Sequence, residues 1–391
     1  MNHRYRVEFL TSHPIQYQAP LFRASTRRPE IDLTVFFCSD QGVRRYRDPG
    51  FGTAFAWDLP LLDGYRSVML PNLNRRGRPG SFLGLVNARI IAELWYGRFD
   101  ALIVHGWAYA TNWLAFCAAS IFGISLMIRG ESNGLREPSG LRRVMKRLAL
   151  GWLFRQTSAF LAIGTLNHRF YRKHGVSSER IFFAPYAVDN AFFQKAAQRL
   201  PPRPALRAER GIPDDTTVFL FCGKLTSAKR PLDALAAFQR LDNRERAALL
   251  FVGDGPLRAE IEAHAVGMPN VSVTGFRNQS ELPREYAVAD VLLLPSEFEP
   301  WGLVVNEALN FGLAVVASDQ VGAATDLVRA EDGGHIVPVG DVAALSRVMH
   351  RCMEERPGRP RTSTKRLIDE WTIEHCADGI LDALSALRSR S

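Results

Sequence analysis

The stretch of residues 290–318, DVLLLPSEFEPWGLVVNEALNFGLAVVAS, constrains the fold of this chain more than any other. Residues 291–294 and 314–317 are apolar runs of strand length. Between them, residues 295–301 have the composition of a loop and residues 302–310 that of a helix. We therefore predict a strand, a helix and a second strand in succession. Two strands joined by such a crossover run parallel in one sheet.

Strand-length apolar runs recur along the chain, with helical patterns between them. The further runs are residues 6–10, 33–37, 101–104, 125–128, 159–163, 218–222, 249–252 and 271–274. Such alternation is typical of parallel sheets covered by helices on both faces. With 391 residues, the chain is long enough for two such domains. The sequence therefore predicts an α/β protein with two doubly wound parallel sheets.

The predicted domain boundary lies near the middle of the chain. Residues 201–204, PPRP, are rich in proline and typical of a linker, and a new α/β pattern begins after them. We predict a first domain over residues 1–190, a linker over 191–204, a second domain over 205–368, and a helical segment over 369–391.

One apolar run is long enough to be compared with a membrane span. Trp113 to Ile128 has 16 residues, interrupted only by Ser and Gly, whereas a span needs about 20. Because Gly123 divides the run, we interpret it as a core helix followed by a core strand. The chain begins MNHRYRVEFL, without the apolar core of a secretory signal. Its five scattered cysteines form no C-x-x-C pair, which favours a reducing, cytoplasmic setting.

Charge is distributed unevenly. Residues 1–190 carry 25 Lys and Arg against 13 Asp and Glu, a net charge of +12, whereas the remainder carries 24 against 27, or −3. Residues 141–153 have apolar residues at helical spacing and a basic opposite face, which predicts a basic amphipathic helix. Its basic residues are Arg142, Arg143, Lys146 and Arg147. The basic half therefore suits an anionic membrane surface, at which the protein would be peripheral, or an acidic acceptor. A merely solvated helix face is the alternative.

Two carboxylates flank the predicted helix of the first stretch. Glu299 lies just before this helix and Glu307 inside it, so at ~1.5 Å rise per residue they can face one ligand from two heights. Gly302 permits close backbone approach, and the N–H groups of Leu303 and Val304 at the helix start would attract an anion, usually phosphate. The carboxylates fit better as acceptors for sugar hydroxyls. An ordinary surface helix is the alternative, because two glutamates at this spacing are common by chance.

A second phosphate-binding feature follows the predicted strand at residues 218–222. Gly223 comes directly after the strand, and Lys224 and Lys229 lie five residues apart before the next helical pattern. A pyrophosphate could approach the glycine closely, and the two ammonium groups would neutralise its charge.

These motifs occur together in a known family. The segment E-P-W-G-L-V-V-N-E, with seven residues between Glu299 and Glu307, resembles the E-x(7)-E signature of the retaining nucleotide-sugar glycosyltransferases of family 4 (glycosyltransferase group 1), which have the GT-B fold. The likeness extends through G-D-G-P at 253–256 and Gly275-Phe276 to residues 321–337. The resemblance implies two Rossmann-like domains and a last helix that crosses back onto the first.

The resemblance also implies roles for the residues that match. In that family Glu307 would hold the ribose hydroxyls, Glu299 the sugar, and Gly275 and Phe276 would lie against the base of a UDP- or GDP-sugar. Lys224, Lys229 and the amides after Gly302 would stabilise the departing diphosphate. The family has arginine where Lys224 stands, and lysine keeps the charge but loses the bidentate fork.

The expected activity is transfer of a sugar to a glycan or lipid-linked acceptor with retention of the anomeric configuration. We expect no cofactor and no metal, since no D-x-D pair follows a predicted strand near the phosphate site. Two alternatives are a nucleotide-sugar epimerase of the same architecture and a non-catalytic protein that binds anionic surfaces. No pattern typical of nucleic-acid binding occurs.

Polar residues that follow the strands of the first half are candidates for the acceptor side, because α/β sheets bind ligands at strand carboxyl ends. His13, Gln16 and Tyr17 follow the first strand, where the family usually has a glycine-rich loop. His105, which we also consider as a catalytic residue, follows the strand at 101–104; Arg129 and Glu131 follow the strand at 125–128. Family members often carry histidine near the position of Arg129. A capped turn after the first strand and a purely structural His105 are the alternatives.

Overall fold

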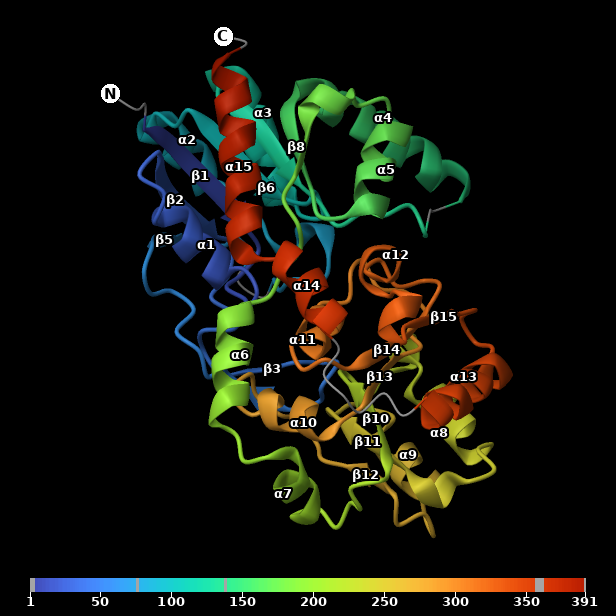
Figure 1. The fold of residues 1–391 in the computed structure, drawn as a ribbon. Coiled ribbons are helices and arrows are strands. Elements are labelled where there is room, and N and C mark those ends of the chain that lie inside the picture. Colours follow the sequence, from blue (N-terminus) through green and yellow to red (C-terminus); the bar gives the residue numbers. More distant parts are fainter. Residues whose placement is uncertain (1–3, 75–76, 137–138, 356–361, 390–391) are drawn as a thin grey trace. The chain divides into compact units, whose positions relative to one another are not determined.

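The computed structural model describes residues 4–74, 77–136, 139–355 and 362–389 (Figure 1). The described residues fold into two compact units. The first comprises residues 4–45, 60–186 and 373–389, and the second comprises residues 46–59 and 187–372. Each unit contains one large parallel sheet with helices on both faces, so the predicted α/β class is confirmed.

The sheet of the first unit has seven strands in the order β5-β2-β1-β6-β7-β8-β9. These are β1 (Tyr5–Thr11), β2 (Ile31–Phe37), β5 (Arg66–Met69), β6 (Ala101–His105), β7 (Ser125–Arg129), β8 (Thr157–Ala162) and β9 (Ile181–Phe183), all parallel. The chain passes from β1 outward to β5 and then returns to the other side of β1. This reversal makes the carboxyl ends of β1 and β6 the switch point of the sheet.

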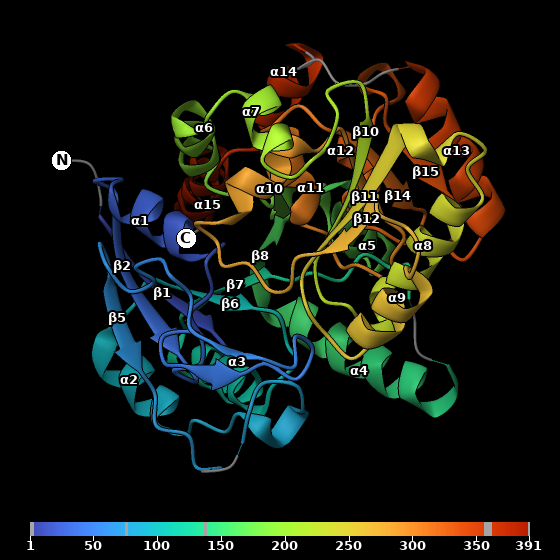
Figure 2. The ribbon, with the colours of Figure 1, turned by 90° about the horizontal axis from the view of Figure 1, so that it is seen from below.

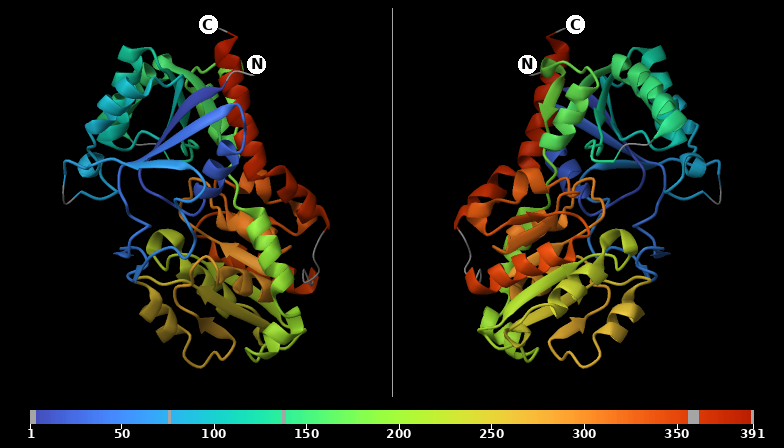
Figure 3. Two further views of the ribbon diagram at one scale, coloured as in Figure 1. Left: turned by 90° about the vertical axis from the view of Figure 1, so that its left-hand side faces the viewer. Right: turned by 90° about the vertical axis from the view of Figure 1, so that its right-hand side faces the viewer.

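Among the described residues, six α-helices belong to the first unit. They are α1 (Ala19–Thr26), α2 (Arg89–Gly97), α3 (Ala110–Phe122), α4 (Gly140–Gln156), α5 (Thr165–Lys173) and α15 (Ile373–Arg388). Helices α1 and α15 lie side by side on one face, and α2 and α3 pack together on the other (Figure 3). The apolar run at 113–128 is confirmed as a helix and a strand, separated at Gly123, whose φ is 70°.

The C-terminal helix α15 packs on β8, β9 and α1, which confirms the predicted return to the first domain. The closest approach is at Gly379, where an added Cβ would lie 1.9 Å from the carbonyl oxygen of Phe183. Only glycine fits at that distance, since no side chain can be accommodated so close to backbone.

The sheet of the second unit has six parallel strands in the order β12-β11-β10-β13-β14-β15. These are β10 (Thr217–Cys222), β11 (Ala247–Val252), β12 (Val271–Val273), β13 (Val291–Leu294), β14 (Ala314–Ser318) and β15 (His335–Val337). Again the strand order reverses, here between β10 and β13. The predicted strands at 291–294 and 314–317 are confirmed as β13 and β14.

Helices α8 (Pro231–Gln239), α9 (Arg258–His264) and α13 (Val342–Glu355) cover one face of this sheet, and α10 (Leu282–Val288) and α11 (Val304–Leu309) the other (Figure 2). Against the second pair pack α6 (Asn190–Arg199), α7 (Arg203–Ala208) and α14 (Thr362–Glu370); α12 (Ala324–Leu327) follows β14. Residues 191–204, interpreted as a linker, thus contain most of α6 and the start of α7. The Asp189 side chain caps α6 by accepting from the Phe192 amide at 2.9 Å.

A short antiparallel hairpin also belongs to the second unit. Strands β3 (Tyr46–Arg47) and β4 (Ala54–Phe55) lie within residues 46–59, which the sequence had assigned to the first domain. The predicted domain boundaries did not include this segment in the second domain. No sequence pattern had indicated the hairpin.

Glu8 is a carboxyl buried within β1. It is 0% exposed, and neither carboxylate oxygen has a hydrogen-bond partner among the residues that the structure describes. Burial raises its pKa well above the ordinary value, and the charge of Glu93 adds to this effect. The folded state therefore holds a proton that the unfolded chain releases near pH 4.3. The free energy of unfolding should fall as the pH rises from there toward the raised pKa of Glu8.

We expect Glu8→Gln to raise the free energy of unfolding at pH 8 by about 1–3 kcal/mol, because a neutral side chain removes the cost of burying or protonating the carboxylate. The difference should shrink toward pH 4. Urea unfolding at several pH values measures it, with the exposed Glu179→Gln as a control in the same unit. A Glu8→Gln variant with the pH dependence of the wild type would contradict the assignment.

Candidate functional site

The switch point of the second sheet gathers the predicted phosphate-binding residues. Strands β10 and β13 are neighbours, with Phe219 paired to Val291 and Leu220 to Leu292. Gly223 follows the end of β10, and its amide donates to the carbonyl of Val252 at 2.9 Å. In open α/β sheets ligands bind at the carboxyl ends of strands where the order reverses. The strand order, which the sequence could not supply, thus selects this edge as the candidate site.

Lys229 and Glu299 form an ion pair at this edge. The Lys229 ammonium donates to Oε1 of Glu299, and the Ser296 hydroxyl donates to the same oxygen at 2.9 Å. Glu299 is only 6% exposed. Its backbone is fixed on both sides, because its amide donates to Gln320 and its carbonyl accepts from Gly322. Two residues 70 positions apart are therefore held together, with the lysine side chain 31% exposed.

Glu307 is buried on α11, with 1% exposure. The Tyr286 hydroxyl donates to Glu307 Oε2 at 2.5 Å, and the Gln279 amide donates to Oε1 at 3.3 Å. Burial raises the pKa of Tyr286 well above its ordinary value, and the charges of Cys222 and Glu307 raise it further. Tyr286 thus remains a hydrogen-bond donor at neutral pH. Neither Tyr286 nor Gln279 was predicted, since nothing local in the sequence pairs them with Glu307.

The loop before α11 approaches the sheet closely at Gly302. Its φ is +102°, and an added Cβ would lie 3.2 Å from side-chain atoms of both Leu294 and Val321. Glycine is required here for both reasons. Helix α11 begins at Val304 and has six residues, so it is shorter than the predicted 302–310. Leu303 and Val304 lie at its start as expected, but a helix this short adds little dipole.

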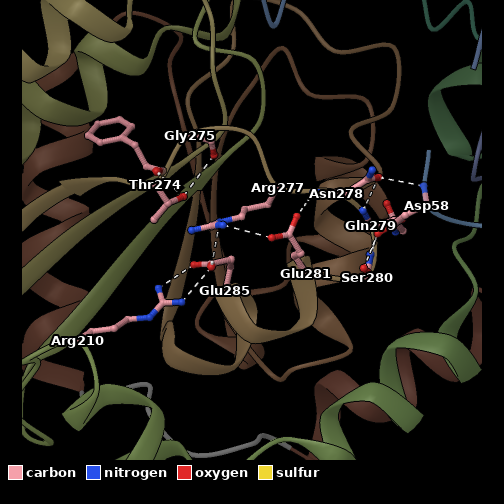
Figure 4. Close-up of polar contacts among 11 residues, drawn as sticks. Asp58, Arg210, Thr274, Gly275, Arg277, Asn278, Gln279, Ser280, Glu281 and Glu285 are labelled. Carbon is pink, nitrogen blue, oxygen red and sulfur yellow. Dashed lines mark hydrogen bonds and ion pairs between the residues drawn. The ribbon is translucent and has the colours of Figure 1, made fainter. Parts of the chain in front are cut away.

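The loop after β12 carries the predicted residues Gly275 and Phe276. The φ of Gly275 is +75°, and its carbonyl accepts from the Gly253 amide at 2.9 Å. Figure 4 shows the residues that follow this glycine. Arg277 lies 3.2 Å from Glu281, and Arg210 donates to both oxygens of Glu285 at 2.7 and 2.9 Å. Arg277 also lies 3.7 Å from Glu285 of α10, so its ion pairs hold the loop against this helix and leave Phe276 at the carboxyl edge of the sheet.

Lys224 is paired with Asp48, which the sequence did not predict. Its Nζ lies 2.9 and 3.0 Å from the two carboxylate oxygens. Burial alone would raise the pKa of Asp48, but the hydrogen bond and charge of Lys224 and the amides of Phe51 and Gly50 lower it overall. Asp48 is therefore ionised at neutral pH and neutralises the charge of Lys224.

In the first unit, His105 and Glu131 lie at the carboxyl ends of β6 and β7. His105 Nε2 is 3.4 Å from Glu131 Oε1 and 3.3 Å from the hydroxyl of Tyr186, which itself donates to Glu131. Burial would raise the pKa of Glu131, but the hydrogen bond and charge of His105 lower it to about 2. Tyr186 was not predicted as a site residue; it stands in the segment A-P-Y-A-V-D at 184–189, which precedes α6.

Arg129 is buried beneath this cluster. It is 2% exposed, its guanidinium lies 4.3 Å from the centre of the Tyr186 ring, and its Nη2 lies 3.5 Å from Cys376 Sγ and from the carbonyl oxygens of Ala184 and Pro185. The prediction placed Arg129 on the ligand side. In the structure its guanidinium instead points into the first unit, where it lies beside the backbone carbonyls of the segment after β9.

His13, Gln16 and Tyr17 follow β1, the neighbour of β6. The Ser12 hydroxyl and His13 Nδ1 are 2.9 Å apart, and Gln16 is 8% exposed. His13 therefore follows β1, and His105 ends β6, the adjacent strand at the switch point of the first sheet. Within the described ranges, no group of three or more His, Cys, Asp or Glu is arranged to hold a metal ion. None of the described helices is long and apolar enough to cross a membrane.

Comparison with known families decides what this site belongs to. The sequence profile of the family described as glycosyl transferases group 1 matches residues 202–368. These residues form a group 1 glycosyltransferase domain. The predicted group 1 family is thereby confirmed for the segment that carries Lys224, Lys229, Glu299 and Glu307.

Curated relatives resemble the glycosyltransferase domain at moderate identity. Sulfoquinovosyl transferase SQD2 of Arabidopsis thaliana is 32% identical over 156 residues, which are 39% of this chain and 30% of that protein. A GDP-mannose-dependent alpha-(1-6)-phosphatidylinositol dimannoside mannosyltransferase of Mycobacterium tuberculosis is 32% identical over 193 residues, 48% of this chain and 49% of that one. For 2-deoxystreptamine glucosyltransferase of Streptomyces kanamyceticus the values are 32% over 213 residues, 52% and 54%. The chain thus matches only about a third to a half of these relatives' lengths.

Solved structures resemble the whole chain in fold. The glycosyltransferase of Rickettsia africae has a TM-score of 0.75 at 14% identity, covering 99% of this chain and 100% of that one. Anabaena Alr3699/HepE in complex with UDP and glucose has a TM-score of 0.72 at 18% identity, covering 98% and 100%. At such identities the likeness shows the fold alone. It confirms that the chain has the GT-B fold, of which the glycosyltransferase domain is one part.

Proposed function

We propose that this protein is a retaining glycosyltransferase of family 4 that moves a sugar from a nucleotide-diphospho-sugar to a glycan or lipid-linked acceptor. The observation that carries the proposal is the Lys229–Glu299 pair at the switch point of a group 1 glycosyltransferase domain. It supplies one cation for a leaving diphosphate and one carboxylate for sugar hydroxyls. One named relative is GDP-mannose-dependent, and one fold neighbour was solved with UDP and glucose, which supports a UDP- or GDP-sugar donor.

The donor would be held by the second unit. Lys229, Lys224 and Gly223 would bind the diphosphate, with the amides of Leu303 and Val304 beside Gly302 as further donors. Glu307, oriented by Tyr286 and Gln279, would accept from the ribose hydroxyls, and Gly275 and Phe276 would contact the base. Stabilising charge on the departing diphosphate is the main catalytic effect we assign to this unit.

We assign front-face transfer to this site. In such a step the bond from the anomeric carbon to the diphosphate breaks while the bond to the acceptor oxygen forms on the same face, and the acceptor proton passes to a diphosphate oxygen. A double displacement would need a free carboxylate nucleophile beneath the anomeric carbon. Glu299 Oε1 already accepts from Lys229 and Ser296, which favours its role as a hydroxyl acceptor over that of a nucleophile.

The acceptor would be bound by the first unit. His105 and Glu131, linked through Tyr186, and His13, Gln16 and Tyr17 follow strands at its switch point. His105 would contact the acceptor hydroxyl, while Arg129 would support the cluster from below. The net charge of +12 on residues 1–190 favours an anionic acceptor or surface.

A donor screen tests the proposed function. Melting with UDP, GDP, ADP and their sugars should identify the donor, since a ligand at 100 times its dissociation constant adds ~2.7 kcal/mol. The donor is then incubated with candidate acceptors, and the anomeric proton coupling of fresh product is read by NMR. Consumption of donor with retention supports the proposal, and an inverted centre contradicts it. An epimerised donor without acceptor would indicate an epimerase, and no turnover would indicate a non-catalytic protein.

We propose that transfer needs no metal ion, because lysines stand where a cation would neutralise the diphosphate. Activity in excess EDTA should therefore remain within about twofold of the untreated enzyme. The measurement is donor consumption before and after chelation, with added magnesium or manganese as the comparison. Complete loss in EDTA that either ion restores would refute this prediction.

We also propose that α4 contacts an anionic membrane surface from the cytoplasmic side. Its apolar residues are exposed: Leu141 by 74%, Val144 by 53%, Met145 by 63% and Leu148 by 71%. Basic residues alternate with them along the helix. An exposed apolar stripe beside basic residues is typical of helices that lie in the membrane interface.

In liposome flotation at low salt, Arg142→Gln combined with Arg147→Gln should weaken binding to anionic vesicles by about 2 kcal/mol, roughly 30-fold, at ~1 kcal/mol for each basic residue near the surface. The matched control replaces Arg169 and Lys173 of α5 by Gln and should bind like the wild type. Equal flotation of both double variants, or equal binding to neutral vesicles, would contradict a role for α4.

A further inference from the structure

Residues 46–59 form a hairpin that folds onto the glycosyltransferase domain of the same unit. Tyr46 pairs with Phe55 and Arg47 with Ala54 across β3 and β4. Asp48 organises the turn between them, because its Oδ1 accepts from the amides of Gly50 and Phe51 at 2.8 and 3.0 Å. The turn conformation is therefore set within the hairpin itself, and the hairpin can present Asp48 as a preformed anion.

The anion lies on Lys224. Both carboxylate oxygens of Asp48 are within 3.0 Å of Nζ, and Asp48 is 7% exposed. The hairpin backbone also packs closely against the aliphatic part of the Lys224 side chain, since a Cβ added at Gly50 would lie 2.5 Å from Lys224 Cδ. A carboxylate that engages an ammonium through two oxygens is chemically similar to a phosphate oxygen pair. The hairpin thus occupies the cation that follows β10.

An aromatic ring of the same hairpin lies on Phe276. The rings of Phe55 and Phe276 are stacked, with centroids 4.3 Å apart and planes at 30°, and Phe51 meets Phe276 edge-on at 5.0 Å. Phe276 follows β12, two strands from β10 in the sheet. One hairpin therefore places a flat ring and an anion on two separate positions of the carboxyl edge. A nucleoside diphosphate carries the same two features, a flat base and an anionic diphosphate.

We propose that the hairpin is an internal competitor of the donor nucleotide: without donor, Asp48 occupies the place of the diphosphate on Lys224 and Phe55 the place of the base on Phe276. This inference rests on the proposed function, which assigns a nucleotide to these residues. Donor binding then requires the tip of the hairpin to leave. The apparent dissociation constant is the intrinsic one divided by the fraction of protein whose hairpin is displaced.

The base of the hairpin is anchored away from these two contacts. The Asn278 side chain donates to the Ala56 carbonyl at 2.8 Å. The Ser280 amide donates to Asp58 at 3.2 Å (Figure 4). Neither contact involves Lys224 or Phe276. Residues 56–58 can therefore stay attached while Asp48 and Phe55 withdraw, so that the hairpin remains bound to the second unit at its base.

Titration calorimetry of the full chain with UDP, GDP, ADP and pyrophosphate tests the proposal. Asp48→Asn should bind the preferred nucleoside diphosphate, and pyrophosphate, about tenfold more tightly than the wild type, because the neutral amide competes poorly for Lys224. The matched control is Asp242→Asn, which removes an exposed carboxylate of the same unit and should change affinity less than twofold. Hydrogen exchange supplies an independent readout: the nucleotide should raise amide exchange in residues 46–55.

Each other outcome is decisive. Unchanged or weaker nucleotide binding by Asp48→Asn overturns the competition. Slower amide exchange of residues 46–55 with nucleotide bound also overturns it, because the hairpin would then stay in place when the nucleotide binds. If none of the three nucleotides binds the wild type or Asp48→Asn, the proposed donor site falls, and this inference falls with it. If a nucleotide binds the wild type but Asp48→Asn binds it no more tightly, only the competition is overturned, and the proposed donor site stands.

Discussion

Turnover should fall by roughly two orders of magnitude or more in Lys229→Ala and in Glu299→Ala, the cost typical of losing one group that stabilises charge in a transition state. Lys229 would lose its contact with the departing diphosphate, and Glu299 its hold on the sugar and on Lys229. Initial rates of donor consumption at saturating donor and acceptor measure the effect. The exposed Lys195→Ala, in the same unit, is the control and should retain wild-type turnover.

The two residues should act as a unit, because the ammonium donates to the carboxylate of Glu299, which is buried. The double variant should therefore be little slower than the worse single variant, as is usual for catalytic groups that depend on one another. Near-normal turnover in either single variant would remove that residue from the proposed mechanism. Additive losses would show that the ion pair is incidental to catalysis.

The free energy of unfolding should fall by about 3–5 kcal/mol in Asp290→Ala, the range for breaking a buried ion pair by removing one partner. Asp290 is 5% exposed and precedes β13. Its Oδ2 accepts from Arg207 at 2.6 Å and from the Val218 amide at 2.7 Å, and its Oδ1 accepts from Arg203. Burial lowers the pKa of Arg207, which is 2% exposed, but the charge of Asp290 opposes this.

Urea unfolding measures this loss, with Asp242→Ala as an exposed control that should change the free energy by less than about 0.5 kcal/mol. Combining Asp290→Leu with Arg207→Leu should recover much of the stability, since apolar residues of similar volume often replace buried pairs without cost. A loss below 1 kcal/mol in Asp290→Ala would mean that the carbonyls of Val288, Asp214 and Thr216, which also accept from Arg207, satisfy it alone.

Much of the candidate site was predictable because it is local in sequence. Glu299 and Glu307 flank one short helix, and Gly223, Lys224 and Lys229 follow one strand, so spacing along the chain already places each set on one element. The pairing of Lys229 with Glu299 was not predictable. It depends on β10 and β13 being neighbours, and an apolar run carries no information about which other run it will join.

Residues supplied by distant segments were missed for the same reason. Asp48, Tyr186, Gln279 and Tyr286 carry no motif, and each acquires a partner only when the chain is folded. Arg129 shows the opposite error. Its position at a strand end predicted a ligand contact. In the structure the segment after β9 and the C-terminal helix cover Arg129, and its guanidinium contacts the Ala184 and Pro185 carbonyls and Cys376 Sγ.

The sequence by itself determined the class of fold, the position of most strands and the family of residues 202–368, because apolar periodicity and short motifs depend on neighbours along the chain. The tertiary structure alone decided the strand order of both sheets, the pairing of Lys229 with Glu299, and the attachment of residues 46–59 to the second unit. These features depend on packing between segments far apart in sequence. Lys224 illustrates the difference. The motif after the strand at 218–222 already contained this lysine, but its ion pair with Asp48, 176 residues earlier, was fixed only by the fold.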